Sequence, residues 1–240
     1  PSTTPTVTGL AGGTFAFNPL PGDGATINAA SGAISNGVGG TTYTIEYTTN
    51  GACPQSSTQT ITVNALPVVD VPDASVCIGG TVSLTATGAS TYTWSPGTYL
   101  DVTTGGTVNT TPAVDIVYTV TGTDANGCVN TDATSVTIIP NAPINAGPDV
   151  SICLGASTDL TATGGATYNW QAPISAAGAV QTVSPVVTTT YTVDGVDAQG
   201  CTGTDQVTVS IYPTPTVDAV ADQTLCAATA TTDVTFTGSV

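Results

Sequence analysis

One internal repeat constrains this chain more than any other feature. The segment 77–128 holds a cysteine, two strand patterns and a hairpin, in the order Cys77, VSLTATG (82–88), TYTW (91–94) and YTVTGTDANGC (118–128). The segment 153–201 holds the same landmarks, in the order Cys153, DLTATGG (159–165), TYNW (167–170) and YTVDGVDAQGC (191–201). Two copies of one domain are therefore expected, and the rest of the chain is divided around them.

The composition favours β-structure. Roughly a fifth of the residues are threonine, which fits strands and weakens helices. Short runs of Val, Ile, Thr and Tyr alternate with Gly, Pro, Asn and Asp, which is the spacing of an all-β sandwich. The chain is 40% hydrophobic and 7% charged, so it lacks the dense charge of a disordered protein. No apolar run is long enough to span a bilayer. Neither an initiator methionine nor a leader is present, which predicts a mature fragment or an excerpt.

The chain has no Lys, Arg or His and 16 acidic residues. Nucleic-acid binding is excluded because no cation can neutralise phosphates. Ser-His-Asp and Cys-His catalysis lack their base. Glycoside hydrolysis by a carboxylate pair is not expected either, since Glu46 is the only glutamate. The sequence therefore predicts a protein that is not an enzyme, with no catalytic residue and no bound cofactor.

Each copy of the repeat has one early and one late cysteine. Even pairing in such a chain indicates disulfides formed in an oxidising, extracellular compartment. We expect one bond inside each copy, Cys77–Cys128 and Cys153–Cys201. A bond that closes a loop of about 50 residues could stabilise so small a domain by roughly 4 kcal/mol.

Four segments are expected along the chain: a divergent domain at 1–64, the two copies at 67–140 and 141–212, and the start of a further domain at 216–240. Cys53 occupies the late position of the first segment and Cys226 the early position of the last. Neither has a partner in its own segment, so both are expected to pair outside the chain. The linkers are short and several contain proline, which predicts semi-rigid joints and an extended rod.

Four aromatic residues are expected in the domain cores: Trp94, Trp170, Tyr118 and Tyr191. Each tryptophan shares a strand face with a tyrosine two residues earlier, in the position where sandwiches bury an aromatic side chain. A sugar-stacking role for the tryptophans is the less favoured reading, because stacking needs exposed rings.

Five aspartates lie in turns and inter-domain segments: Asp70, Asp73, Asp124, Asp149 and Asp197. Carboxylate oxygens there could bind Ca²⁺ between domains. Asp in turns more commonly forms local hydrogen bonds, and no segment matches an EF-hand loop. Calcium therefore remains an alternative without an assigned ligand set.

At VCIGGTVSLTATGASTYTW (76–94) and YTVTGTDANGC (118–128), the sequence resembles the Ig-like and PKD-like repeats of Bacteroidota cell-surface adhesins. Those tandem proteins, which include gliding-motility adhesins, are exported by the type IX secretion system. TGLAGGTF (8–15) and INAASGAI (27–34) resemble a related module. The resemblance implies tandem Ig-like sandwiches in a stalk on the bacterial cell surface. It carries over no catalytic residue. Cys128 and Cys201 depart from true Ig domains because they follow the hairpin turn.

Three functions are therefore weighed. The first is a structural stalk, in which the partners are neighbouring repeats of the same chain and other copies in a filament or bundle. The second is a carbohydrate- or surface-binding module that uses Ca²⁺. The third is a polymerising filament subunit, completed by strands of its neighbour through a bond between Cys226 and Cys53.

Overall fold

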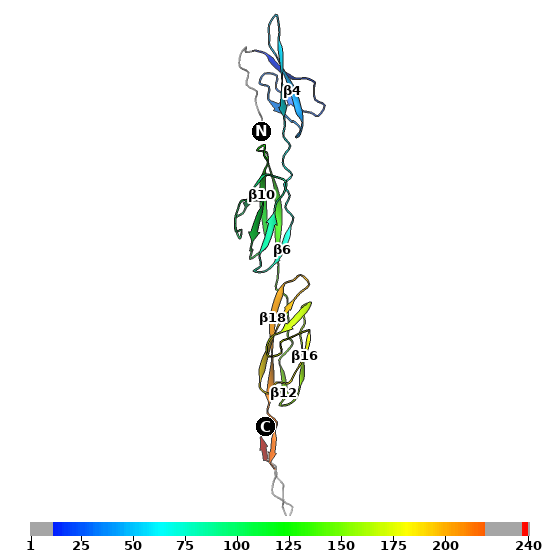
Figure 1. Cartoon of the computed structure of the whole chain (residues 1–240), viewed down its shortest axis with the longest axis vertical. Helices are drawn as coiled ribbons and strands as arrows, with labels where there is room; N and C mark the ends of the chain where they lie inside the picture. Colours follow the sequence, from blue (N-terminus) through cyan, green and yellow to red (C-terminus); the bar gives the residue numbers. More distant parts are fainter. Residues whose placement is uncertain (1–11, 219–236, 240) are drawn as a thin grey trace, which may run out of the picture. The chain divides into compact units, whose positions relative to one another are not determined.

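The computed structural model describes residues 12–218 and 237–239, and within these residues every regular element is a β-strand (Figure 1). The chain divides into two compact units, one up to Ile138 and one from Ile139. The described residues contain three separate hydrophobic clusters, two in the first unit and one in the second. We refer to the folded segments around them as the first module, the second sandwich and the third sandwich. The predicted all-β fold of tandem sandwiches is confirmed.

The first module combines a three-stranded sheet with a short hairpin. Its strands are β1 (Thr14–Phe17), β2 (Thr26–Ile27), β3 (Ile34–Ser35), β4 (Thr42–Thr48) and β5 (Ser56–Thr62). The sheet order is β1-β4-β5, and β2 pairs with β3. Because successive side chains of a strand point to opposite faces, Phe15 and Phe17 both enter the core, where Tyr43 and Ile45 meet them.

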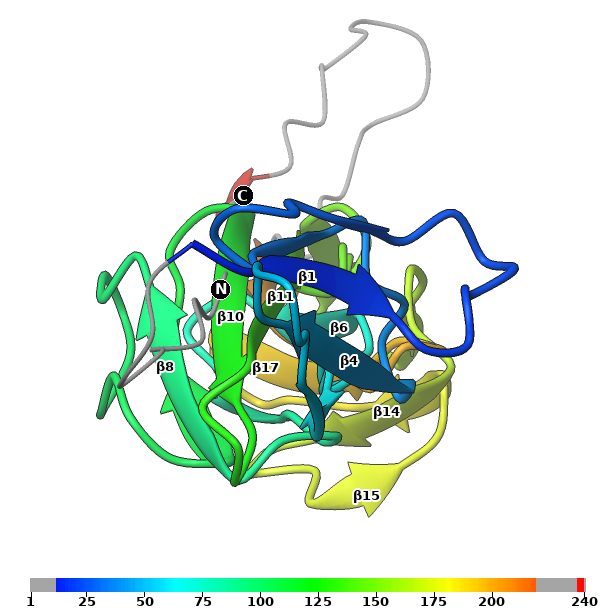
Figure 2. The ribbon, with the colours of Figure 1, turned by 90° about the horizontal axis from the view of Figure 1, so that it is seen from above.

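The second sandwich has two layers. Its strands are β6 (Ala74–Cys77), β7 (Val82–Thr85), β8 (Thr91–Ser95), β9 (Thr107–Thr110), β10 (Ile116–Thr123) and β11 (Val129–Ile139). One sheet has the order β6-β11-β10-β8, and the other consists of β7 and β9. Figure 2 shows β8 and β10 side by side, and their register pairs Trp94 with Val120.

The third sandwich repeats this plan. Its strands are β12 (Val150–Cys153), β13 (Thr158–Thr161), β14 (Thr167–Trp170), β15 (Ala176–Ala177), β16 (Val180–Val183), β17 (Thr189–Val196) and β18 (Thr202–Tyr212). The larger sheet has the order β12-β18-β17-β14-β15, and β13 pairs with β16. After it, β19 (Thr216–Asp218) pairs with β20 (Thr237–Ser239). The rest of the expected further domain, including Cys226, lies outside the described residues.

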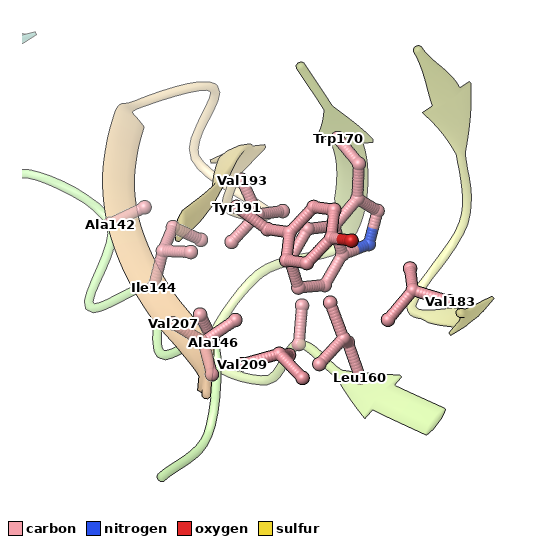
Figure 3. Close-up of a cluster of buried hydrophobic side chains, with 11 residues drawn as sticks. Ala142, Ile144, Ala146, Leu160, Trp170, Val183, Tyr191, Val193, Val207 and Val209 are labelled. Carbon is pink, nitrogen blue, oxygen red and sulfur yellow. The ribbon is translucent and has the colours of Figure 1, made fainter. Parts of the chain in front are cut away.

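The core of the third sandwich lies between its two sheets. Figure 3 shows Trp170, Tyr191 and Val193 of the larger sheet directed towards Leu160 and Val183 of the smaller one. The alternation of apolar and hydroxyl residues in the sequence produces this arrangement, because alternate side chains of each strand point inward. The second sandwich has an equivalent core around Trp94 and Tyr118.

Candidate functional site: the two ends of each sandwich

The chain enters and leaves the third sandwich at opposite ends. At one end, the backbone N–H of Ala142 donates to the carbonyl of Thr202, the first residue of β18, at 3.1 Å. The chain leaves after Tyr212, the last residue of the same strand. An 11-residue strand is roughly 36 Å long at about 3.3 Å per residue. We call these the entry end and the exit end.

The second sandwich has the same polarity. At its entry end, Asn130 at the start of β11 donates from Nδ2 to the carbonyl of Pro67 at 2.9 Å. Its exit end is where β11 finishes at Ile139. Both copies therefore receive the chain at one end of their longest strand and release it at the other.

The cysteines lie at these ends. In the third sandwich, β12 runs parallel to β18 and pairs Cys153 with Tyr212, so Cys153 lies at the exit end. Cys201 directly precedes Thr202 and lies at the entry end. The repeat places Cys77 and Cys128 equivalently, since Cys77 ends β6, the neighbour of β11, and Cys128 directly precedes β11.

The expected bonds Cys77–Cys128 and Cys153–Cys201 are therefore wrong. Each of these pairs is separated by the length of an 11-residue strand, whereas the Cα atoms of a disulfide lie within about 7 Å. In the structure, Cys128 and Cys153 are free thiols, and Cys77 and Cys201 are disulfide-bonded. The prediction failed because the first strand of each copy runs parallel to the last strand. The cysteine at the end of the first strand therefore lies at the exit end, whereas the cysteine before the last strand lies at the entry end.

Two other cysteines were expected to pair outside the chain. Cys53 is an exposed free thiol in the described structure, and Cys226 is not among the described residues. Their pairing remains a prediction.

The tryptophans are buried and hydrogen-bonded. Trp94 is 4% exposed and Trp170 is fully buried. Their indole N–H groups donate to the carbonyls of Gly105 at 2.9 Å and Gly178 at 3.1 Å. Neither ring offers a face to a sugar. Tyr118 and Tyr191 are also buried, and the Tyr118 hydroxyl donates to the carbonyl of Thr98 at 2.8 Å.

The aspartates at the turns and joints bind backbone N–H groups. Asp124 and Asp197 cap the two equivalent hairpins, and one carboxylate oxygen of each accepts from Cys128 and Cys201 respectively at 2.8 Å. Asp73 accepts from the N–H of Ser135, and Asp149 from that of Thr208, both at 2.7 Å. No side-chain bond is recorded for Asp70, whose backbone pairs with Thr87. Among the described residues, no three carboxylate or cysteine groups gather closely enough to hold a metal ion.

Two further aspartates were missed by the sequence reasoning. Asp132 on β11 accepts from the N–H of Val71 at 2.9 Å, and Asp205 on β18 accepts from that of Ala146 at 2.8 Å. Together with Asp73 and Asp149, they fasten the entering segment of each copy to its last strand, and we call the four residues the aspartate clasps. Their recurrence at the offsets of the repeat, 73 and 76 residues, was the signal that could have found them.

Removing one clasp tests this role. We expect Asp205→Ala to lower the free energy of unfolding of the third sandwich by about 1–3 kcal/mol, because the N–H of the buried residue Ala146 loses its acceptor. Asp159→Ala is the matched control, since Asp159 is exposed and accepts only from the exposed Thr182 hydroxyl. Urea unfolding followed by tryptophan fluorescence in a Trp94→Phe background, where only Trp170 remains, measures both variants. Equal and small losses of unfolding free energy in the two variants would show that the Asp205 clasp does not stabilise the sandwich.

Among the described residues, Asp101 and Asp23 have shifted pKa values. The backbone N–H and side-chain amide of Asn109 lower the pKa of Asp101 by hydrogen bonding. The Tyr43 hydroxyl, 2.5 Å from Asp23, lowers the pKa of that carboxyl. Burial, followed by the Asp23 carboxylate, raises the pKa of Tyr43. Both arrangements hold loops in place.

A groove of about 540 Å³ lies on the larger sheet of the third sandwich. Asn169, Asp194 and Thr204 contribute polar side chains to it, and Tyr168 is its one aromatic residue. Such a groove can accept hydrogen-bonding ligands.

The sequence matches no known family model and no curated protein sequence. Solved structures with a similar arrangement include Ig-like and fibronectin-like domains. The I67–I69 fragment of titin is 13% identical over 88% of this chain and 91% of its own length, with a TM-score of 0.33. Sidekick-1 immunoglobulin domains 1–5 are 12% identical over 84% of this chain and 52% of their own length, with a TM-score of 0.31. The fibronectin(III)-like modules of Clostridium thermocellum CbhA are 13% identical over 61% of this chain and 95% of their own length, with a TM-score of 0.28.

The strand arrangement of the chain is itself Ig-like. In the second sandwich, the strand that begins at Val82 pairs only with the strand that begins at Thr107. In the third sandwich, the strand that begins at Thr158 pairs only with the strand that begins at Val180. The remaining strands of each sandwich form its second layer. A disulfide is typical of extracellular domains. Across residues 12–218 and 237–239, the structure contains no helix that could cross a membrane.

Proposed function

We propose that this chain is a segment of the structural stalk of a long extracellular adhesin, giving reach and stiffness without catalysis. The observation that carries the proposal is the opposite placement of chain entry and exit in both copies. Domains joined in this way extend a chain by nearly their full length at each repeat. A domain whose ends lay side by side would fold the chain back on itself.

The exposed faces support a stalk. Across β7 and β9, the hydroxyls of Thr81 and Thr111 lie 2.7 Å apart and those of Thr85 and Thr107 lie 3.1 Å apart. These hydroxyl groups keep the surface solvated although the chain has no lysine or arginine. Because those two residues are absent, trypsin-like proteases find no cleavage site. With a formal charge of −16, neighbouring domains repel one another at low salt.

The resemblance to Bacteroidota repeats supports a finer assignment, a stalk on the bacterial cell surface exported by type IX secretion. Gliding motility is one process in which such stalks act. Bundling of several chains would require cations or contacts between threonine-rich faces.

The polar groove of the third sandwich favours one alternative, a carbohydrate-binding module. Its ligand would hydrogen-bond to Asn169, Asp194 and Thr204, which share one face of the sheet. Saturable binding of a glycan from an array, lost in Asn169→Ala, would support this alternative over a purely mechanical role.

Small-angle X-ray scattering of the 240-residue chain tests the stalk. At about 3.3 Å per residue, two sandwiches with 11-residue strands and a first module with 7-residue strands, placed in line, give a radius of gyration of about 27 Å. A compact chain of this length would have about 18 Å. A value near 18 Å at physiological salt would contradict the proposal.

A further inference from the structure

The smaller sheet of the third sandwich has an uncovered edge along β16 (Figure 1). The sheet contains only β13 and β16, and the N–H of Ala162 donates to the carbonyl of Ala179. Because bonded pairs alternate along antiparallel strands, Gln181 also faces β13, whereas Val180 and Thr182 turn their backbone groups away from it. Among the described residues, none forms a backbone hydrogen bond with these two outward-facing residues.

The equivalent edge of the second sandwich is covered by its own chain. Asn109 on β9 donates its N–H to Oδ1 of Asp101 at 2.9 Å, and its carbonyl accepts from the N–H of Asp101 at 3.0 Å. Asp101 belongs to the connection 95–106, which has 12 residues, whereas the equivalent connection 171–179 has nine. The shorter connection of the third sandwich supplies no such cover to β16.

The β16 strand lacks the features that usually keep an exposed edge from pairing. Edge strands are commonly protected by a charged residue, a proline or a bulge, whereas β16 reads VQTV. Although the chain has 16 acidic residues, the only one on this sheet is Asp159, which lies on β13 and not at the edge. Val180 is 54% exposed. The edge is therefore uncharged, partly apolar and open to another strand.

We propose that β16 pairs with β16 of a second copy of this chain, across a two-fold axis that passes through Gln181. Antiparallel pairing in this register places Val180 opposite Thr182 of the second copy. These two residues lie on the same face of the sheet, as opposite residues must, and both direct their N–H and C=O groups to the edge. Each such pair can exchange two hydrogen bonds. The two small sheets thereby become one sheet of four strands.

The acidic charge of the chain permits this pairing at physiological salt. Asp159 and its counterpart in the second copy would be separated by three strand spacings, about 14 Å. That separation exceeds the Debye length of about 8 Å at physiological ionic strength. Added salt should therefore strengthen the pairing, because it screens the repulsion between two chains that each carry a formal charge of −16.

The direction of the strands gives the pairing a role in adhesion. The two sheets of a sandwich have strand directions within about 30° of each other, so antiparallel β16 strands also make the β18 strands of the two copies point in opposite directions. A two-fold interface closes on itself and joins chains two at a time. It therefore suits two stalks that meet from facing surfaces. This adhesive role rests on the proposed stalk function, but the pairing itself does not.

Sedimentation equilibrium of the full chain tests the pairing. At physiological salt, the weight-average mass should rise towards twice the monomer mass as the concentration approaches about 1 mM. Thr182→Pro should stay monomeric, because it removes an outward N–H at an edge position where proline is tolerated. Thr182→Val is the matched control and should pair like the parent, since it loses only the hydroxyl bond to Asp159.

A loop exchange tests the same edge without a proline. Replacing 171–179 with a copy of 95–106 should cover β16 and keep the chain monomeric. Tryptophan fluorescence during urea unfolding confirms that each variant is folded. A parent that stays monomeric up to about 1 mM, or a loop-exchange variant that pairs as the parent does, would overturn the proposal.

Cross-linking tests the register and the direction of the strands. Gln181→Cys should form a disulfide between two copies, because opposite residues of a non-hydrogen-bonded pair have Cα atoms about 4.5 Å apart. In Val186→Cys, the two cysteines lie on opposite sides of the axis, about 20 Å or more apart, and should not cross-link. Both variants are made with alanine at Cys53, Cys128, Cys153 and Cys226. Cross-linking of Val186→Cys to an equal or greater extent would refute the antiparallel pair.

Scattering at low and high concentration separates this proposal from the stalk. Extended chains that remain monomeric at about 1 mM would leave the stalk in place and refute the pairing. Compact chains that form a dimer sensitive to Thr182→Pro would support the pairing and refute the stalk.

Discussion

Trp170→Ala should unfold the third sandwich at temperatures where the second remains folded. Trp170 is fully buried between the sheets, and its indole N–H is bonded to Gly178 (Figure 3). Removing such a side chain costs about 3–5 kcal/mol, from lost burial and the cavity that remains. A domain of about 70 residues has little more than that in reserve. The other copy keeps its own core around Trp94.

Calorimetry combined with fluorescence measures this. The chain has two tryptophans, so in Trp170→Ala the remaining fluorescence comes from Trp94 alone and reports the second sandwich. We expect one calorimetric transition to shift down by tens of degrees while the Trp94 transition stays in place. Val186→Ala is the control, because Val186 is 73% exposed. An equal decrease in the temperatures of both transitions would show that the two sandwiches unfold as one unit.

Gly164→Ala should destabilise the third sandwich by about 3 kcal/mol or more. Gly164 has a φ of +88°, and a Cβ added there would overlap the carbonyl oxygen of Pro143 in the entering segment. The left-handed conformation costs an L-residue about 1–2 kcal/mol, and displacing packed backbone costs about 1–3 kcal/mol more. Because that segment lies against the loop, no side-chain movement relieves the overlap.

Gly155→Ala is the matched control for this substitution. Gly155 has nearly the same φ, +87°, but nothing lies within 4 Å of its added Cβ. The Gly155 substitution should therefore cost only the conformational term, about 1–2 kcal/mol. Urea unfolding of the two variants in a Trp94→Phe background, followed by the fluorescence of the remaining Trp170, gives the difference. The second sandwich offers an independent repetition with Gly88 and Gly79, which differ in the same way. Equal losses at Gly164 and Gly155 would show that close packing of the entering segment is unimportant.

The sequence by itself determined the local features of the chain. Alternation of apolar and hydroxyl residues depends only on the two-residue period of a strand, so it predicted the strands around Leu84 and Leu160 and the inward faces that bury them. The repeat predicted that the two copies share one fold. The Asp-x-x-Gly-Cys turns predicted the hairpins at Asp124 and Asp197, because a turn is formed by neighbouring residues.

The tertiary structure decided which distant segments meet. The cysteine partners, the aspartate clasps and the need for glycine at Gly88 and Gly164 all depend on how the entering segment and first strand of each copy lie against the rest of its sandwich. Neither the spacing nor the periodicity of residues encodes how the entering segment and the first strand lie against the sandwich. Because β12 pairs with the exit half of β18, Cys153 lies about 30 Å or more from Cys201. The global arrangement of the strands decides which cysteines can pair, and that arrangement is visible only in the folded chain.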